Sequence, residues 1–338
     1  MAACTDKLKK ENQKGAMQLA VKNELLALLE ASRGKVISGQ ELAQRLGVSR
    51  AAVWKAATAL RAQGVAVSAA PGSGYSLLPE SDFLSQEAAE TYFAPQKAPV
   101  RVLQEAASTN LLAKQWAIDG APHGSMVVAE KQTQGRGRLG RSFASPPGGL
   151  YLSVVLRPQR AAGNPVLITA AAAVAVCRAA QALCGIELSI KWVNDLFLKG
   201  KKCCGILTEA GTGFESGSIE YIVVGIGINY RTRPEEFAPE IRQIATSLYP
   251  GGTAQLPRLQ LAAAIYENLL AAFAHLENKE FLQEYRARSL ALGREVTVLA
   301  QPPYTATALA IDDEARLVVK KQNGETAVLS AGEISIRL

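Results

Sequence analysis

Residues 131–141 read Lys-Gln-Thr-Gln-Gly-Arg-Gly-Arg-Leu-Gly-Arg and follow an apolar run at 125–129 that is typical of a buried strand. Glycine lets a backbone turn sharply and approach a ligand, and the arginine guanidinium suits paired hydrogen bonds with carboxylates and phosphates. The glycines are Gly135, Gly137 and Gly140, and the arginines are Arg136, Arg138 and Arg141. Because their alternation has neither a helical nor a strand period, the loop is predicted to clamp an anionic, phosphorylated small molecule.

A second interpretation of this loop is a dinucleotide-binding turn, because its three glycines match G-x-G-x-x-G. That motif requires a helix at the third glycine and an acidic residue about 20 positions later. Here residues 142–149 read Ser-Phe-Ala-Ser-Pro-Pro-Gly-Gly, which cannot begin a helix, and the expected acidic position falls among Arg-Pro-Gln-Arg at 157–160. The dinucleotide fold is therefore rejected. For the loop taken alone, a solvated basic segment is the remaining alternative.

Length and composition describe a globular protein of several domains. The chain has 338 residues, 48% of them hydrophobic, which predicts two or three packed domains. Its apolar runs are too short to span a bilayer, so no membrane partner is expected. Residues 1–17 are polar and lysine-rich, lack the apolar core of a secretion signal, and are expected to form a disordered tail. The net charge of +7 favours a polyanionic partner.

Cysteine usage indicates the compartment. The five cysteines are an odd number without C-x-x-C spacing, and the chain has only two histidines. The adjacent Cys203 and Cys204 cannot both point to one side of a strand. A structural zinc site is therefore not expected, and reduced thiols in a cytoplasmic protein are the simplest interpretation.

Residues 38–55 have the pattern of a helix-turn-helix. Ser38 with Glu41 forms a capping box at the first helix, and Ser49 caps the second. Between the two helices, Gly47 stands where the turn needs a left-handed backbone. These signals occur together, which favours two short helices joined by a tight turn.

Flanking segments complete a winged DNA-binding module. A short buried helix is predicted at 18–30, and two strands at 65–70 and 75–78, joined by Pro-Gly-Ser-Gly, are typical of a wing. Such a module places the N-terminal part of its second helix in the DNA major groove. The DNA-binding candidates are Ser49, Arg50 and Lys55. The alternative is a module used only for protein contacts.

A second domain is predicted after the polar segment 79–85. A strand at 100–104 leads into Ser108-Thr109-Asn110 at the start of a helix. A plain N-cap is a sufficient explanation for Ser108. The free N–H groups of a helix start, however, also favour an anionic ligand.

Two polar segments of this domain suit phosphate chemistry. Lys191-Trp-Val-Asn-Asp195 follows a short strand at 188–190 and places a cation, an amide and a carboxylate at one strand end. Lys191 suits a phosphate, and the Asn and Asp suit Mg²⁺ or an amine; an ordinary polar turn is the alternative. Lys202 stands where a hairpin enters its second strand, 203–210, and a surface lysine is the alternative there.

Gly225 and Gly227 alternate along the apolar strand 222–228, so both leave the backbone bare on one face of a sheet. A flat ligand can lie on such a patch, and close packing of a helix explains the glycines equally well. Amphipathic helices at 256–276 and 279–292 close this domain. The rest of the chain consists of short β runs separated by turn residues, which predict a small β-barrel.

Together these features resemble one family, the biotin–protein ligases that also repress the biotin operon. The most specific part is the Gly-Arg loop combined with Lys-Trp-x-Asn-Asp and with Lys-Cys-Cys-Gly-Ile-Leu at 202–207. The resemblance implies an α+β multidomain fold. Its parts are a winged helix-turn-helix at 18–80, a central α/β domain of the class II synthetase type found in biotin and lipoate ligases at 85–290, and an SH3-like β-barrel at 291–338.

The resemblance also implies a reaction. Biotin and ATP would form biotinyl-5′-AMP, and a lysine of the biotin carboxyl carrier domain of acetyl-CoA carboxylase, or of a similar carboxylase, would then attack it. It implies Mg²⁺ bound through the phosphates without a dedicated protein cage, operator DNA as a partner, and a homodimer when the adenylate is bound. Because this chemistry joins two anions, positioning and charge neutralisation can suffice without a covalent nucleophile.

The implied roles are carried over residue by residue. Those implied in biotin binding are Ser108, Thr109, Asn110, Gln132, Gly137, Gly225 and Gly227. Those implied at the biotin carboxylate and α-phosphate during catalysis are Arg136, Arg138 and Lys202, together with Asp195. Those implied for ATP and Mg²⁺ are Lys191, Asn194, Asp195 and Arg141.

Three positions depart from the family pattern. Ala107 stands where an aspartate is common, Val193 where a proline is frequent, and Leu139 where a polar or basic residue is usual. None of them removes a charge that the reaction needs. The alternatives are a ligase with an inactive DNA module, a ligand-sensing repressor with an inactive catalytic domain, and a lipoate-type ligase. The retained cations argue against the inactive catalytic domain, and the wing argues against a ligase-only chain.

Overall fold

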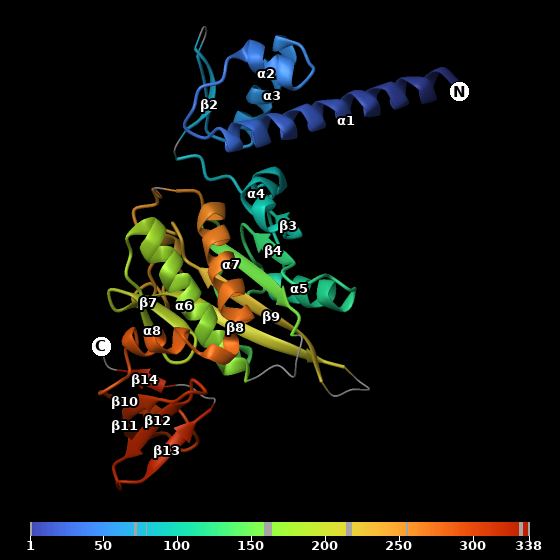
Figure 1. Cartoon of the computed structure of the whole chain (residues 1–338). Helices are drawn as coiled ribbons and strands as arrows, with labels where there is room; N and C mark the ends of the chain where they lie inside the picture. The colour runs from blue at the N-terminus through green and yellow to red at the C-terminus, as the bar shows by residue number, and fades with distance from the viewer. Residues whose placement is uncertain are drawn as a thin grey trace. The chain divides into compact units, whose positions relative to one another are not determined.

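The computed structural model describes residues 2–70, 73–78, 80–158, 164–213, 218–254, 256–330 and 334–336. Its contacts divide the chain into two compact units. One consists of Met1–Lys97 with Gln255–Leu259, and the other of Ala98–Ala254 with Gln260–Leu338. Figure 1 shows the elements of each unit.

The first unit combines helices with a two-stranded sheet. Its elements are α1 (Ala2–Ala31), α2 (Gly39–Arg45), α3 (Arg50–Ala62), β1 (Val67–Ala70), β2 (Gly74–Leu77), α4 (Gln86–Phe93) and the 3-10 turn η1 (Ala94–Gln96). The antiparallel β1 and β2 form the predicted wing, whose tip at Pro71 and Gly72 lies outside the described residues. This unit is longer than the predicted module of residues 18–80, because α4 packs against α1.

The predicted caps of the helix-turn-helix are confirmed. The Ser38 hydroxyl accepts the Glu41 N–H at 3.1 Å, and the Ser49 hydroxyl accepts the Ala52 N–H at 3.2 Å. Gly47 has a φ of +62°, the left-handed conformation that the tight turn requires. Two short helices therefore start and stop where their capping residues stand.

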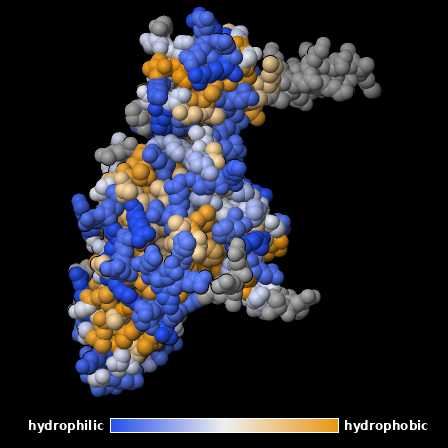
Figure 2. Space-filling view, in the orientation of Figure 1, coloured by the Kyte–Doolittle hydropathy of each residue, from blue (hydrophilic) through white to orange (hydrophobic). Residues whose placement is uncertain are grey.

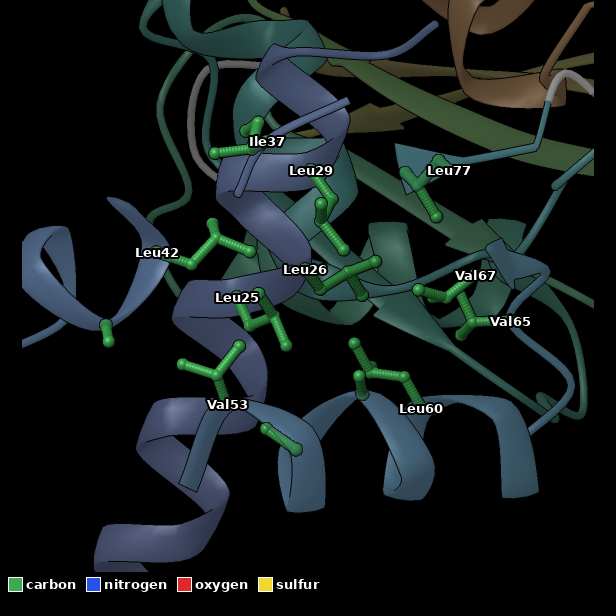
Figure 3. Close-up of a cluster of buried hydrophobic side chains, with 13 residues drawn as sticks. Leu25, Leu26, Leu29, Ile37, Leu42, Val53, Leu60, Val65, Val67 and Leu77 are labelled. Atoms are coloured by element: carbon green, nitrogen blue, oxygen red, sulfur yellow. The ribbon is translucent and has the colours of Figure 1, made fainter. Parts of the chain in front are cut away.

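An apolar cluster holds α1, α2, α3 and the wing together (Figure 3). Each element contributes one apolar stripe, so no element is stable without the others. The labelled side chains are Leu25, Leu26, Leu29, Ile37, Leu42, Val53, Leu60, Val65, Val67 and Leu77. Burial of this cluster orients α3, whose opposite face remains in solvent.

The N-terminus differs from the expected disordered tail at residues 1–17. Helix α1 begins at Ala2 and continues without interruption to Ala31. The segment is rich in alanine and lysine, which have high helix propensity, and Gly15 is its only strong helix breaker. Because it lacks an apolar stripe, hydrophobic periodicity gives no sign of this part of the helix.

A buried ion pair fixes the start of α7. The Arg258 N–H donates to Asp82 Oδ1 at 2.8 Å, and the Arg258 guanidinium pairs with the same carboxylate at 2.7 Å. Both side chains are almost fully buried, at 1% and 4% exposure. The helix therefore begins at Arg258 rather than at residue 256, because a side chain outside the helix caps its first N–H.

A seven-stranded sheet forms the centre of the second unit, in the order β3-β4-β5-β9-β8-β7-β6. β3 and β4 pair in parallel, and the other neighbours pair antiparallel. The strands are β3 (Val100–Leu103), β4 (Met126–Ala129), β5 (Leu150–Leu156), β6 (Ser189–Lys191), β7 (Asp195–Leu198), β8 (Lys201–Thr212) and β9 (Ile219–Ile228). The helices and 3-10 turns are α5 (Thr109–Ile118), η2 (Arg138–Gly140), α6 (Pro165–Cys184), η3 (Pro234–Glu236), α7 (Arg258–Ala274), η4 (Leu276–Asn278) and α8 (Phe281–Ala287).

Different helices cover the two faces of this sheet. On one face, the hydroxyls of Thr169 of α6 and Thr208 of β8 are hydrogen-bonded at 2.8 Å, and α6 also packs on α8 (Figure 1). On the other face, α5 buries Ala113 and Ala117 against Val223 of β9. Helix α6 is long and apolar enough to cross a membrane, but most of it is buried in the fold, as expected for a core helix. Because strand side chains alternate, every second residue of β8 and β9 lies on the α5 face.

Helix α8 ends before the predicted residue 292. Beyond Ala287 the chain pairs with β6: the Ile190 N–H donates to Arg288 O, and the Leu290 N–H donates to Ile190 O, both at 2.8 Å. An apolar pattern alone does not distinguish this extended segment from the last turn of a helix.

Five antiparallel strands follow, as the short β runs predict. They are β10 (Glu295–Val298), β11 (Tyr304–Ile311), β12 (Leu317–Lys321), β13 (Thr326–Leu329) and β14 (Ile334–Ile336), in the order β13-β12-β11-β10-β14. The α+β fold class is thus confirmed. The exact domain borders at residues 85 and 290 stay predictions.

Candidate active site

Strands β8 and β9 supply the floor of a pocket on the α5 face. Pairing places Gly225 between Ser153 of β5 and Leu207 of β8. A Cβ added to Gly225 would stand 2.0 Å from the Asn110 side-chain oxygen. The glycine therefore makes room for a protein side chain, which in turn shapes the pocket.

Two further glycines of this floor accommodate Phe143. Gly205 and Gly227 are cross-strand partners, and a Cβ on either would come within 3.0 Å of the Phe143 ring. The ring centroid also lies 5.8 Å from Lys202 Nζ. Bare backbone thus supports an aromatic ring beside a cation at one end of the pocket.

Hydroxyl and amide groups form a connected network at the other end. Gln132 Oε1 accepts the Thr109 N–H at 2.8 Å, and Gln132 Nε2 donates to Ser145 Oγ at 2.9 Å. Ser153 Oγ lies 2.8 Å from Thr109 Oγ1 and 2.6 Å from Asn110 Oδ1. Because an amide oxygen only accepts, the Ser153 proton goes to Asn110, and the single Thr109 proton has two acceptors within reach, Ser153 Oγ and, at 3.1 Å, Gln132 Oε1. The network therefore holds the Asn110 and Gln132 amides in place.

Ser108 occupies the N-cap position of α5 without acting as a side-chain cap. Its hydroxyl makes no capping hydrogen bond, although the residue is 2% exposed and lines the pocket. The plain N-cap interpretation of Ser108 is therefore wrong for its side chain.

A carboxylate behind the network orients Asn110. Glu209 accepts hydrogen bonds from Asn110 Nδ2 and from Lys114 Nζ, each at 2.8 Å. Partial burial by itself would raise the pKa of Glu209, but these two hydrogen bonds and the nearby positive charges lower it below its usual value. The carboxylate is consequently ionised at neutral pH and holds the Asn110 amide in one orientation.

The Gly-Arg loop folds back on itself. The Gly137 N–H donates to Arg141 O at 2.7 Å, and the Phe143 N–H donates to Gly135 O at 2.9 Å. A Cβ on Gly135 would stand 2.4 Å from Phe143 O, so this closure requires glycine. Leu139 at the tip has a φ of +55° and is 76% exposed. The closed loop presents arginines to the pocket instead of packing a core.

Four charged or polar side chains meet at the end of the pocket beside this loop. Lys202 Nζ lies 2.7 Å from Asp195 Oδ1, and Arg138 Nη1 donates to Asn194 Oδ1 at 3.2 Å. Asn194 is held in turn by Ile206, whose carbonyl accepts the Asn194 side-chain amide at 2.9 Å. The Gly-Arg loop is thereby joined to the 191–195 segment and to β8, which lie about 60 residues further along the chain.

The 191–195 segment is supported from behind by buried groups. The Trp192 indole N–H donates to Ala315 O, in the turn between β11 and β12, at 2.9 Å. The Tyr285 hydroxyl of α8 donates to Val193 O, also at 2.9 Å. The C-terminal sheet and α8 thus fix the backbone that carries Asn194 and Asp195.

Nearly all predicted site residues line this one pocket, which encloses about 750 Å³ including its open side. Those that do are Ser108, Thr109, Asn110, Gln132, Arg136, Gly137, Arg138, Arg141, Asn194, Asp195, Lys202, Gly225 and Gly227. Lys191 does not line the pocket; its ammonium lies 5.9 Å from the Phe197 ring centroid. On β6 the side chains alternate, so Lys191 need not share the pocket with the residues that follow it.

Several contributors are not evident from the sequence. Phe143 stands in a Ser-Phe-Ala segment that reads only as a loop, and Ser145 and Ser153 have no local signal. Glu209 and Lys114 lie on different elements, so only the fold pairs them. For Gly205, the glycine between Cys204 and Ile206 in an apolar strand is the one available sign, since strand glycines mark close approaches.

The described part of the chain has no metal-binding cluster, and three of its cysteines are buried. No group of three or more His, Cys, Asp or Glu side chains there is placed to hold a metal ion. Cys177, Cys184, Cys203 and Cys204 are free thiols. Burial raises the pKa of Cys177 to about 12 and raises those of Cys203 and Cys204 further, so these three thiols stay protonated and are poor nucleophiles.

The predicted DNA-binding residues lie on the exposed side of α3. Ser49, Arg50 and Lys55 are all exposed, and the surface formed by α2 and α3 is mostly hydrophilic in Figure 2. Two neighbouring basic residues are partly engaged: Arg45 pairs with Glu41 at 2.6 Å, and Arg61 donates to Val67 O at 2.9 Å.

Known proteins match the chain over almost its whole length. Family models match in three places: the HTH domain at residues 21–76, the biotin/lipoate A/B protein ligase family at 102–229, and the biotin protein ligase C-terminal domain at 291–337. The bifunctional ligase/repressor BirA of Bacillus spizizenii is 32% identical, covering 93% of this chain and 98% of its own length. A biotin–[acetyl-CoA-carboxylase] ligase of Mycobacterium tuberculosis is 35% identical over 69% of this chain and 87% of its own.

A solved structure agrees with these sequence relatives. The biotin protein ligase of Aquifex aeolicus, in complex with biotin and ATP, superposes with a TM-score of 0.61 at 29% identity. It covers 71% of this chain and 98% of its own. The match in sequence extends over the DNA-binding, catalytic and C-terminal modules together, and the pocket carries the residues that the family resemblance implies. The chain belongs to the family of bifunctional biotin–protein ligases and repressors.

Proposed function

We propose that this chain uses ATP to attach biotin, via biotinyl-5′-AMP, to a lysine of a carboxylase carrier domain, and that the adenylate-bound protein represses biotin synthesis. The observation that supports the ligase part is a single pocket that joins a neutral hydrogen-bonding end to an end with Arg136, Arg138 and Lys202. Such a pocket suits a ligand with a polar ring at one end and a carboxylate at the other.

Biotin would bind with its ring at the neutral end. Ser108, Thr109 and Gln132 lie there around a buried network, and the residue behind them, Asn110, is already oriented by Glu209. This places the valeryl carboxylate along the glycine floor toward Lys202. Binding energy from the ring would thus position a reactive oxygen at the cationic end.

In the first step a biotin carboxylate oxygen attacks the α-phosphorus of ATP, and pyrophosphate leaves. Two anions must approach each other, so the neutralisation of charge by Lys202 and the loop arginines lowers the barrier. Asp195 holds Lys202 at 2.7 Å and keeps it directed into the pocket. The Phe143 ring, supported by Gly205 and Gly227, is suited to contact the flat adenine.

Mg²⁺ fits this site as a companion of the phosphates. Asn194 and Asp195 are the side-chain oxygen donors at the cationic end, too few for a protein cage, and Mg²⁺ usually keeps waters and phosphate ligands. When bound, the ion neutralises phosphate charge. Lys191, which lies outside the pocket, is not needed for this role.

In the second step the neutral amine of an acceptor lysine attacks the acyl carbon of the adenylate, and AMP leaves. The chain needs no nucleophile of its own, since the amine comes from the acceptor and the leaving group is already activated. Acetyl-CoA carboxylase, named in the Mycobacterium relative, indicates the kind of acceptor.

The N-terminal module would bind operator DNA as part of a homodimer that the adenylate stabilises, in the cytoplasm and away from membranes. Helix-turn-helix dimers bind palindromic sites with two recognition helices. Because the intermediate is consumed by acceptor protein, it would accumulate only when acceptor is scarce. By linkage, adenylate must strengthen dimerisation and DNA binding together.

Isotope exchange tests the ligase. The purified protein is incubated with ATP, labelled pyrophosphate and either biotin or lipoate. Label should enter ATP with biotin and not with lipoate. Exchange that depends on lipoate would select the lipoate-type ligase instead.

Sedimentation tests the repressor. The monomer–dimer equilibrium is measured with and without biotinyl-5′-AMP, and operator binding is measured at one fixed salt concentration. An unchanged equilibrium would reject the coupling even if ligation and DNA binding both occur.

A further inference from the structure

Trp54 is exposed at the surface of the recognition helix. It is 57% exposed, and it is the one aromatic side chain among the exposed large hydrophobic residues of the described chain. It stands on α3 one residue before Lys55 and four residues after Arg50. A single exposed apolar residue needs no explanation by itself, but this one stands on the helix that a helix-turn-helix places in the major groove.

The face around Trp54 is small and uncharged, with cations beside it. Helix α3 buries Val53, Ala56, Ala57 and Leu60, and the opposite face presents Ala51, Trp54 and Thr58. The Thr58 hydroxyl donates to Trp54 O at 2.9 Å, so its proton is used within the helix. Ala51 and Thr58 are short enough to let the helix approach a groove closely.

The charges on α3 indicate the kind of partner that the Trp54 face contacts. Helix α3 contains no acidic residue, and Arg50 and Lys55 are exposed on either side of the Trp54 face. Cations around an apolar centre suit the major groove, where phosphates border the base edges. There the C5-methyl group of thymine is the apolar group that a base pair presents, and apolar side chains recognise it.

We infer that Trp54 determines operator specificity by contacting thymine methyl groups in the major groove, while Arg50 and Lys55 hold the helix on the phosphates and base edges. This rests on the proposed DNA binding by the N-terminal module. It predicts an operator half-site with at least one thymine whose methyl group, rather than its hydrogen-bonding edge, is read.

Uracil substitution isolates the methyl group. A preferred duplex is first selected from random DNA with the full chain and biotinyl-5′-AMP. Each thymine is then replaced by uracil, which removes only the methyl group. For the parent protein, one or two positions per half-site should each weaken binding by about fourfold, the ratio that corresponds to one buried methyl group.

A double-mutant cycle assigns the effect to Trp54. Trp54→Ala should bind the thymine duplex as weakly as the parent binds the uracil duplex, and the same uracil should then cost nothing more. Lys55→Ala is the matched control. It should weaken all duplexes, reduce the salt dependence by about one, and keep the thymine preference. Circular dichroism of each variant checks the fold, which an exposed position should preserve.

The possible results distinguish a failure of the role proposed for Trp54 from a failure of the proposed DNA binding. Equal binding of thymine and uracil duplexes by the parent, or an unchanged thymine preference in Trp54→Ala, overturns the role of Trp54 while DNA binding stands. Loss of dimerisation by Trp54→Ala without DNA overturns it in favour of a protein contact. If the parent binds no duplex even at low salt, the proposed DNA-binding function fails, and the inference with it.

Discussion

The two ends of the pocket are built in opposite ways. At the ring end, Thr109, Asn110 and Ser153 are between 0% and 6% exposed, and their polar groups bond to one another. At the phosphate end, Arg136 and Arg141 are exposed and lie on a loop with a φ of +55° at its tip. One end is a network of polar groups bonded to one another, and the other end gathers the cations Arg136, Arg138, Arg141 and Lys202.

This difference separates recognition from chemistry. The hydrogen bonds of the ring end form during folding, so ligand binding there costs little reorganisation. The cations of the phosphate end gain most of their favourable interactions only when a carboxylate and a phosphate meet, which is the condition for lowering a reaction barrier. Substitutions at the ring end should therefore raise the KM for biotin, and substitutions at the phosphate end should lower kcat or release the intermediate.

Lys202→Ala should have the largest effect, on the chemical step. Loss of a preorganised charge of this kind typically costs about 10²–10³ in rate. Lys201→Ala, one residue away and exposed on the other side of β8, is the matched control and should keep full activity. Pyrophosphate exchange measures the rate and thermal unfolding checks the fold. A fully active Lys202→Ala variant would mean that Lys202 is only a surface lysine.

Arg136→Ala should come next, and it should act on retention of the intermediate. A lost charge-assisted contact costs about 1.5–3 kcal/mol, or roughly tenfold to more than a hundredfold in dissociation rate. Binding of free biotin, which lacks the phosphate, should change less. Lys131→Ala removes a cation of the same loop that is already paired with Glu105 at 2.6 Å, and serves as control. Release of biotinyl-5′-AMP at the same rate from both variants would contradict the clamp.

The phosphate end was the more predictable of the two from the sequence. Its arginines lie in a loop whose Gly-Arg alternation has neither a helical nor a strand period, and the segment with Asn194 and Asp195 follows a predicted strand. Likewise, Ser38, Gly47 and Ser49 predict the helix-turn-helix. Both serines cap a helix in the structure, and Gly47 has the left-handed backbone conformation that glycine favours. Sequence signals predict a structural feature when one residue forms it together with its neighbours in the chain.

The ring end could not be predicted in the same way. Glu209 and Asn110 are 99 residues apart, and their hydrogen bond depends on the register of β8 and on the packing of α5 against the sheet. The same limit applies at the phosphate end to Phe143, whose position depends on Gly205 and Gly227 of two neighbouring strands. The position of Lys191 outside the pocket lining has the same origin, because strand alternation, not sequence adjacency to Asn194, decides what it faces.

Gly225→Ala should displace the Asn110 side chain at the ring end by a steric clash. The new Cβ would stand 2.0 Å from Asn110 Oδ1, so the amide held by Ser153 and Glu209 must move. Overpacking of this kind costs about 1–3 kcal/mol, and it should appear as a raised KM for biotin with little change in kcat. Gly251→Ala, where nothing lies within 4 Å, is the control. A lowered kcat at unchanged KM would contradict the separation of the two ends.

Glu209→Gln should have the smallest effect on the KM for biotin, and it should change the pH dependence of stability. The pKa of Glu209 is lowered in the folded protein, against the tendency of burial, by hydrogen bonds from Lys114 and Asn110. Its contribution to stability is therefore present above the unfolded pKa and is lost as the pH falls through the folded one. The pair with Lys114 is about a quarter to a third exposed, at 30% and 27%, so its loss should cost less than about 1 kcal/mol.

Thermal midpoints measured from neutral to acidic pH should fall less steeply in Glu209→Gln than in the parent, and the KM for biotin should rise slightly. Glu325→Gln removes another lysine-paired glutamate, which is exposed and does not line the pocket, and should leave that KM unchanged. If both variants leave the KM for biotin unchanged, Asn110 does not depend on Glu209 for its orientation, and its hydrogen bonds with Ser153 Oγ and, at 3.3 Å, with the Leu207 carbonyl suffice.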